Sequence, residues 1–216
     1  AAHDFVLSAD LHAGLQDLAR ESHSTLFMVI HSALAVLLSR LSGSTDIAIG
    51  TPIAGRGERE LDDLIGMLVN TLVLRTPVEP GESFTDLLAQ IRAVDLAAFE
   101  HTDVPFERLV EAINPQRSRA WHPLFQVMLT FQNMKPVTVD LEGLTVTPVE
   151  VDVSSAKFDL QVTLSDTFDE AGDPGVIYGR FTYATDLFDR STVETFVERF
   201  VRVLDAIVAA PVTPVG

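Results

Sequence analysis

Apolar residues near the start of the chain recur at helical spacing. After Ser8, leucines stand three or four residues apart, a period typical of one face of an α-helix. A longer apolar segment follows at 26–42, with Thr25 suited to its N-cap and Gly43 to the left-handed position after its end. Because this segment is apolar nearly all round, we expect it to be buried.

Polar residues interrupt the second of these helices. They leave fewer than about 18 uninterrupted apolar residues, which argues against a membrane span. The interruptions are His31, Ser32, Ser39 and Arg40. A lone histidine in a core helix is typical of a hydrogen-bonded structural residue, and we interpret His31 in that way.

Runs rich in leucine and β-branched residues predict strands. The first is centred on Ile47 and Ile49 and should end at Gly50 and Pro52. Further strands are expected at 68–78, 124–133, 144–153, 157–166 and 176–188. The stretch TFDEAGDPG (167–175) predicts a flexible connection between the last two, because it combines glycine, proline and acidic residues.

Two more helices complete the pattern. Ser83 and Asp86 have the spacing of a capping box ahead of one, and Ser191 and Glu194 have it ahead of the other. No repeat or linker divides the chain. The order is helices and strands mixed, then a block of strands, then a helix. It indicates one α/β sandwich with helices packed on a mostly continuous sheet.

Charge and composition narrow the class of protein. The 216 residues carry a formal net charge of −16 and include no cysteine. The charge disfavours nucleic acid and anionic membrane surfaces as partners. The lack of cysteine excludes disulfides, zinc–thiolate sites and a cysteine nucleophile. No secretory signal is visible, so a cytoplasmic protein is expected. The first residue is alanine, which suggests a segment of a longer polypeptide.

The common nucleotide-binding and hydrolase motifs are absent. The chain contains no G-x-G-x-x-G, no G-x-x-x-x-G-K-[ST] and no G-x-S-x-G. The stretch GTPIAGRG (50–57) is rich in glycine, but it lacks the lysine that a phosphate-binding loop needs. None of the six histidines has an i, i+4 partner with a third ligand in view, so no metal site is expected.

The segment HTDVPFERLV (101–110) gathers histidine, carboxylates, arginine and proline into ten residues. It is either a catalytic cluster or the start of a helix. Asp103 suits the N-cap of a helix that begins at Pro105, and the helix dipole favours Glu107 in the first turn. This structural interpretation leaves only His101 without a role, and we favour it.

A second polar segment, RSRAWHP (117–123), is basic in a chain with only 15 lysine and arginine residues. Arg117, Arg119 and His122 lie close together within it. Two interpretations stay open. The segment is an anchor made of internal salt bridges, or it docks a phosphate-bearing arm or an acidic carrier.

Three segments, taken in order, resemble the last three core motifs of condensation domains from non-ribosomal peptide synthetases. They are IGMLVNTLVLR (65–75), HTDVPFERLV (101–110) and RSRAWHPLFQVML (117–129). Similar stretches at 25–56, 157–164 and 183–200 extend the resemblance to nearly the whole chain. Three motifs in the family's order are a far more specific signal than any one of them.

The sequence departs from the family in one respect. The family's catalytic signature, H-H-x-x-x-D-G, lies in the N-terminal half of the domain, and this chain has no H-H pair. Residues 1–216 therefore resemble the C-terminal subdomain alone. The resemblance places the histidine that handles the proton, or stabilises the tetrahedral intermediate, in a missing N-terminal subdomain. We expect no catalytic residue within this chain and no activity from it alone.

The resemblance implies a chloramphenicol-acetyltransferase-like two-layer sandwich, with a mixed sheet and helices packed on one face. It implies peptide-bond formation between two substrates held as thioesters on phosphopantetheine arms. These arms would enter a tunnel between the two halves, where proximity and orientation supply most of the rate gain. The implied partners are the missing subdomain, the donor and acceptor peptidyl carrier proteins and a neighbouring adenylation domain. The implied product is a secondary metabolite such as a peptide antibiotic.

The resemblance also suggests which residues face the tunnel. Asn70 is polar within an apolar strand, so it is either a buried hydrogen-bonding residue or a group that faces the thioester. Residues at a strand start would line the acceptor side: Ser154, Ser155, Lys157 and Asp159. The stretch 167–175 is a candidate latch, and 50–64 a candidate floor. The residues assigned to the motifs as structural are His101, Asp103, Pro105, Phe106, Glu107, Arg117, Arg119 and Pro123.

Two other functions remain compatible with these motifs. One is a non-catalytic module that docks carrier proteins, and the other is half of a related epimerisation domain. The strand VNTLVLR (69–75) favours condensation over epimerisation. A half-domain without its partner should expose an apolar face, and the mean hydropathy of +0.24 agrees with such a face. We therefore predict self-association in solution.

Overall fold

One six-stranded sheet organises the chain. The computed structural model describes residues 1–54, 65–66, 68–115, 118, 121–132, 144 and 155–215. In chain order its elements are β1 (Ala2–Leu7), α1 (Ala9–Glu21), α2 (Leu26–Ser42), β2 (Asp46–Ala54), β3 (Val69–Pro77), α3 (Phe84–Phe99), α4 (Phe106–Ile113), β4 (Val127–Gln132), β5 (Leu160–Phe168), β6 (Pro174–Tyr183) and α5 (Arg190–Ala209).

The sheet is mixed, as predicted. Its strand order is β1-β6-β5-β4-β2-β3. The inner pairs β2–β4 and β4–β5 are parallel, whereas β1–β6, β5–β6 and β2–β3 are antiparallel. Parallel strands need cover on their faces, and here the helices between and after the strands supply it on one side.

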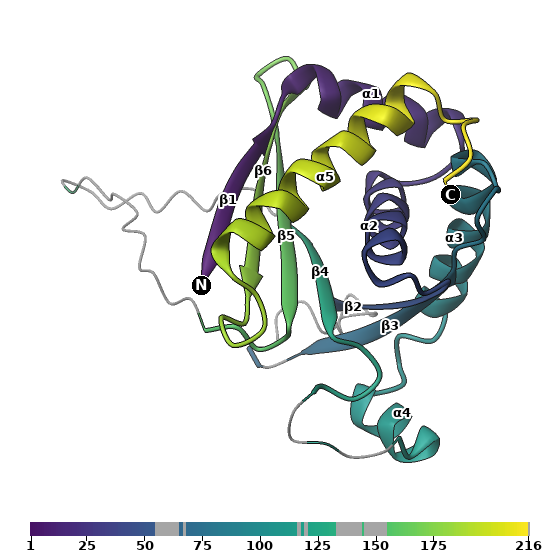
Figure 1. The fold of residues 1–216 in the computed structure, drawn as a ribbon, viewed down its shortest axis with the longest axis vertical. Helices are drawn as coiled ribbons and strands as arrows, with labels where there is room; N and C mark the ends of the chain where they lie inside the picture. The colour runs from purple at the N-terminus through teal and green to yellow at the C-terminus, as the bar shows by residue number, and fades with distance from the viewer. Residues whose placement is uncertain are drawn as a thin grey trace.

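Four helices pack on one face of the sheet, and the fifth stands apart. Figure 1 shows α1, α2, α3 and α5 on the same side of the curved sheet, with α2 surrounded by the others. The core between the layers includes large side chains with no exposed surface, such as Leu34 and Phe200. The two-layer sandwich with helices on one face is therefore confirmed. Helix α4 extends away from this layer, near the start of β3 (Figure 1).

The predicted capping residues Thr25 and Ser83 set two helix boundaries in the first half, and Ser8, which was not predicted as a cap, sets a third. The hydroxyl oxygens of Ser8, Thr25 and Ser83 accept hydrogen bonds from the backbone N–H groups of Leu11, Met28 and Asp86, each at 3.2 Å. Gly43 ends α2 in the left-handed conformation, with φ of 70°. Thr25, Gly43 and Ser83 could be identified from the sequence because residues of these types stabilise the backbone groups that a helix end leaves unpaired.

The buried histidine of α2 has the structural role expected of it. His31 Nδ1 lies 3.2 Å from Asp95 Oδ2 on α3, and its Nε2 lies 3.4 Å from the Thr76 hydroxyl on β3. All three side chains are fully buried. The imidazole therefore joins two helices to the sheet inside the core.

Strand β2 is longer than predicted. It runs through Gly50 and Pro52, where we expected it to end, and reaches Ala54. Its pairing with β4 is confined to Ile49 and Gly50, so beyond this point β3 alone pairs with it. Proline is tolerated where a strand has one open edge, which is why Pro52 does not stop β2.

Several boundaries in the second half were also wrong. Helix α5 begins at Arg190 with Asp189 as its N-cap, not at a Ser191–Glu194 capping box. Glu194 accepts a hydrogen bond from Arg190 at 2.8 Å instead. The predicted flexible link 167–175 is a tight hairpin, in which the Asp169 side chain accepts two backbone N–H groups.

Two further differences concern strands. The edge strand β1 was not predicted, although Phe5 packs over Gly179 of β6. Strand β4 begins at Val127, because Leu124 takes a left-handed conformation with φ of 70°. The strand expected at 144–153 lies outside the described residues except for Leu144.

No single helix in the described ranges is long and apolar enough to cross a membrane. Helices α1 and α2 meet that criterion only as a pair, and the pair is bent by 103°.

Candidate functional site

The motif at 101–110 is held to the sheet by one side chain, Asn70 of β3. The Asn70 amide donates hydrogen bonds to the carbonyl oxygens of Thr102 at 3.0 Å and Val104 at 2.8 Å. Its oxygen accepts from the N–H of Phe106 at 3.0 Å and of Thr71 at 2.8 Å. These four bonds use both donors and both lone pairs of the amide. The loop and α4 are therefore fixed in place by a residue 32 to 36 positions earlier in the chain.

Asn70 takes the capping role that we expected of Asp103. Helix α4 begins at Phe106, its N-cap residue is Pro105, and no cap side chain bonds to it. The Phe106 N–H would otherwise be an unpaired backbone donor, and the Asn70 oxygen satisfies it. Asp103 is exposed. The prediction failed because sequence spacing identifies caps within a segment and cannot identify a cap from another strand.

The other polar residues of the motif have local roles. The backbone of His101 forms a turn, in which its carbonyl accepts the N–H of Val104 at 3.2 Å. The His101 side chain is exposed and has no hydrogen-bond partner in the described part of the chain. Glu107 lies in the first turn of α4, where the helix dipole favours a negative charge. The prediction that this motif starts a helix is confirmed.

An aromatic cluster packs against the first turn of α4. Phe106 stacks on His122 with ring centres 5.3 Å apart and planes 24° apart. His122 contacts Phe125 at 4.4 Å and Phe158 at 5.0 Å. We call Phe106, His122, Phe125 and Phe158 the aromatic cluster. It joins α4, the segment before β4 and the segment before β5, which are distant in the sequence.

Gly50 of β2 makes room for the aromatic cluster. A Cβ atom at Gly50 would lie 2.3 Å from the Phe125 ring, far inside van der Waals contact. Phe125 is fully buried. The sequence alone indicated a glycine-rich strand end here, and the structure explains Gly50 by this close approach.

His122 brings a polar atom into the cluster. Its Nδ1 is buried and has no hydrogen-bond partner in the described ranges. Neighbouring residues 116, 117, 119 and 120 lie outside those ranges, so the predictions for Arg117 and Arg119 stay untested. Pro123 is half-buried beside His122.

The described residues predicted for the acceptor side differ in exposure and surroundings. Ser155 and Lys157 are exposed, and Ser154 lies outside the described residues. Phe158 turns toward the aromatic cluster, whereas Asp159 lines a hollow of about 430 Å³ on the helix side, beside Phe188 and Phe196. Burial raises the pKa of the Asp159 carboxyl above its ordinary value. The tunnel assignments of these residues and of Asn70 stay predictions.

Exposed apolar side chains occur on and near α4. They are Val69, Val104, Ile113 and Trp121, each more than 40% exposed. Helix α4 itself has no buried residue, although one of its faces is apolar. Apolar surface of this extent is typical of a region that another part of a protein covers.

The described residues contain no group of three or more metal-ligating side chains.

Comparison with known proteins identifies the family. The family model for the condensation domain matches residues 2–216. The chain is 46% identical over 212 residues to a dimodular nonribosomal peptide synthase of Bacillus subtilis, covering 98% of this chain and 9% of that protein. It is 44% identical over 203 residues to an isonitrile lipopeptide synthase of Mycobacterium tuberculosis, covering 94% of this chain and 8% of that protein.

Solved structures agree in fold. The X-domain from teicoplanin biosynthesis matches all of this chain and 49% of its own, with a TM-score of 0.90 and 28% identity. A four-domain nonribosomal peptide synthetase bound to AMP and glycine also matches all of this chain and 17% of its own, with a TM-score of 0.90 and 25% identity. The chain thus spans about half the length of the solved X-domain and a small part of the synthetases. On the extent of these matches, the chain belongs to the condensation-domain family of nonribosomal peptide synthetases.

Proposed function

We propose that the chain is the C-terminal subdomain of a condensation domain and that it forms a peptide bond together with an N-terminal subdomain. One observation carries the proposal. The condensation model matches residues 2–216, while the X-domain that shares the fold is about twice as long. The absence of an H-H pair from the sequence supports the C-terminal assignment, because the resemblance places that pair in the other half.

The proposed reaction joins two carrier-bound substrates. The amine of the acceptor aminoacyl thioester attacks the carbonyl carbon of the donor thioester. The carbon–sulfur bond breaks, the donor carrier leaves with a free thiol, and the amine loses a proton as the amide forms. The phosphopantetheine arms are the substrate carriers in this reaction. Positioning of the two thioesters supplies most of the rate gain.

In this proposal the described half contributes a rigid wall. Asn70 fixes the 101–110 loop through hydrogen bonds to Thr102, Val104 and Phe106, and the aromatic cluster supports the loop from beneath. A wall fixed in this way keeps its shape when the two flexible arms enter. Little further entropy is then lost in orienting the two thioesters when they react. The exposed apolar residues near α4 face the N-terminal subdomain in this arrangement.

The proposed partners follow from the same assignment. They are the N-terminal subdomain, the donor and acceptor peptidyl carrier proteins and an adenylation domain of the same synthetase. Two observations support them: the relatives are synthetases much longer than this chain, and one solved relative is a four-domain synthetase bound to AMP and glycine.

Complementation tests the proposal directly. The purified 216-residue chain is mixed with two carrier proteins, each loaded with an aminoacyl phosphopantetheine arm, with and without the N-terminal subdomain of the B. subtilis relative. We expect peptidyl carrier by mass spectrometry only when both halves are present. A chain that produces no peptide with that subdomain, although the two bind, would refute the proposed activity.

A second candidate function is a recruiting module. The X-domain, which matches with a TM-score of 0.90, was solved in complex with OxyB. If this chain acts in the same way, the complete domain should bind a separate enzyme and form no peptide bond. The higher identity of 46% to a dimodular synthase favours condensation.

A further inference from the structure

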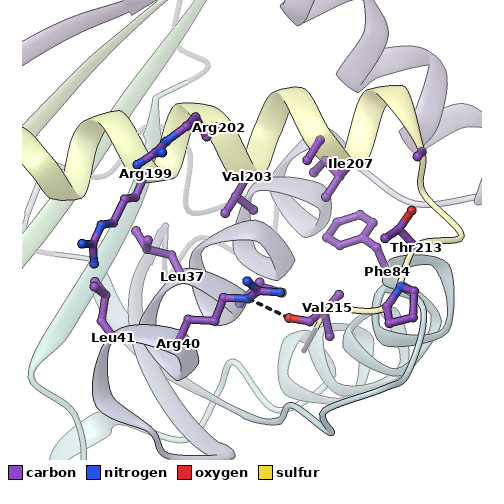
Figure 2. Close-up of a pocket in the computed structure, with 14 residues that line it drawn as sticks. Leu37, Arg40, Leu41, Phe84, Arg199, Arg202, Val203, Ile207, Thr213 and Val215 are labelled. Carbon is purple, nitrogen blue, oxygen red and sulfur yellow. Dashed lines mark hydrogen bonds between the residues drawn. The ribbon is translucent and has the colours of Figure 1, made fainter.

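Two hollows adjoin between α2 and α5, on the helical layer and away from α4. The first has a volume of about 460 Å³ and lies between α2, α5 and the C-terminal residues (Figure 2). The second, of about 430 Å³, lies where β4 and β5 begin and contains Asp159. Leu41 lines both. We call the two together the α2–α5 groove.

The first hollow combines an apolar floor with arginine residues. Figure 2 shows Leu37, Val203, Ile207 and Phe84 around its interior. Three arginines line it as well: Arg40, Arg199 and Arg202. Arg40 Nε donates to the carbonyl oxygen of Val215 at 2.8 Å, so its side chain is held in the hollow. In a chain with a net charge of −16, three guanidinium groups at one hollow are a local reversal of charge.

Two of these arginines have no partner in the described part of the protein. Neither Arg199 nor Arg202 has a carboxylate within ion-pair distance there. Arg190, on the same helix, pairs with Glu194. The unpaired arginines of α5 are thus those that line the hollow, and their charge is available to an anion.

The second hollow carries charge of the opposite sign. Its walls are apolar, with Phe188, Phe196 and Leu160 among them. The Asp159 carboxylate has no cation within ion-pair distance among the residues with described positions. The other carboxylate of this hollow, Asp46, is already paired with Arg75 at 2.7 Å. Along the groove, the free negative charge of Asp159 lies beside Phe196, the free positive charges of Arg199 and Arg202 come next, and Ile207 and Ala210 line an apolar far end.

We propose that the α2–α5 groove binds an extended segment of a partner polypeptide, with a basic side chain at Asp159, acidic side chains beside Arg199 and Arg202 and apolar side chains at the far end, near Ile207. The lining residues of α5 run from Phe196 to Ala210. That stretch is about 21 Å at about 1.5 Å per residue, which about six residues of extended chain would span. Opposite charges in succession along the groove fit a mixed-charge peptide better than a small anion, which would leave Asp159 unpaired. This inference does not depend on the proposed condensation activity.

Peptide titration tests the proposal. The probe is a capped hexapeptide with a lysine at one end, two glutamates in the middle and leucine and alanine at the other end, made in both chain directions. It is titrated into the isotopically labelled chain, and amide shifts are followed by NMR at low salt. We expect shifts at 196–207 and near Asp159 for one direction, with weaker binding when salt is added. A peptide with glutamine at all three charged positions should bind at least about fivefold more weakly, since each exposed ion pair is worth about two- to fivefold in affinity.

Matched variants locate the effect. Arg199→Gln and Asp159→Asn should each weaken binding by about two- to fivefold. Arg190→Gln, on the same helix but outside both hollows, should leave it unchanged. Equal binding of the neutral peptide, or shifts confined to other surfaces, would overturn the proposal. The proposal would also be overturned if decanoate, an apolar anion, caused shifts in the groove and the peptide did not. It would be overturned as well if the chain dimerised through the groove in the absence of peptide.

Discussion

Replacing Asn70 with alanine should release α4 while leaving the sheet folded. The substitution removes the two hydrogen bonds that the side chain donates to Thr102 and Val104 and the one that it accepts from the Phe106 N–H. A typical hydrogen bond contributes about 0.5–1.5 kcal/mol net. Three of them, half-buried, give about 3 kcal/mol, and that figure includes the lost helix cap of about 1 kcal/mol. Helix α4 has no buried residue of its own, and the aromatic cluster contacts its first turn through Phe106, so the later turns should be released.

Amide hydrogen exchange measures this release residue by residue. A loss of about 3 kcal/mol corresponds to about a 100-fold fall in protection, since each 1.4 kcal/mol is tenfold. We expect that fall, or exchange at the unprotected rate, for the amides of Arg108 to Ile113 in Asn70→Ala. Amides of β4 and β5 should keep their protection. The control is Gln126→Ala, which removes one exposed hydrogen bond to His122 and should change exchange in α4 by less than about tenfold.

One result would refute the reasoning. In that result, Asn70→Ala lowers the free energy of global unfolding by about 3 kcal/mol, but the ratio of protection between α4 and the strands β4 and β5 does not change. Asn70 would then support the sheet and would not hold the loop. Asn70→Asp sharpens the test. It is nearly isosteric, but it removes both donors and places a carboxylate oxygen near the carbonyls of Thr102 and Val104, so it should release α4 at least as much as alanine does.

Further predictions concern the core, pH and the exposed apolar surface. Gly50→Ala should cost about 1–3 kcal/mol in urea denaturation by overpacking against Phe125, and adding Phe125→Leu should recover part of that loss. Asp95→Ala should cost about 1–3 kcal/mol, because it leaves the buried Nδ1 of His31 without the hydrogen-bond partner that Asp95 supplies; a loss below about 0.5 kcal/mol would contradict this. Burial raises the folded-state pKa of Asp159, so its ionisation destabilises the fold as pH rises through the carboxyl range. Asp159→Asn should therefore raise the free energy of unfolding near pH 7 but not near pH 2.5. An equal change in that free energy at the two pH values would contradict this prediction. Val104→Ser with Ile113→Ser should weaken any self-association seen by light scattering, whereas a strictly monomeric parent chain would show that this surface does not drive association.

Periodicity and capping chemistry predicted the helical layer, because these signals are local. Ser8, Thr25, Gly43 and Ser83 each act within their own helix. The edge strand β1 was missed, because its pairing partner β6 lies more than 170 residues later. The part of β2 beyond Gly50 was also not predicted. Whether a strand tolerates proline depends on which of its edges is paired, and that is determined by the neighbouring strands.

The candidate site shows the same limit. The motif 101–110 was correctly predicted to start a helix, but its cap comes from Asn70, and its support comes from His122, Phe125 and Phe158. No spacing rule connects these residues. The available signals were an amide in an apolar strand and aromatic residues beside the motifs, and neither specifies a contact.

The central claim is that this chain supplies a positioned wall and not the proton-handling group. Single-turnover peptide formation in the complete two-subdomain domain tests it most directly, with His101→Ala compared with alanine at the second histidine of H-H-x-x-x-D-G. We predict that His101→Ala keeps the rate within about tenfold of the parent, because its side chain is exposed and has no hydrogen-bond or ion-pair partner among the described residues, while general acid–base groups are typically worth about 100-fold or more. A loss with His101→Ala as complete as that with the signature histidine would contradict the account.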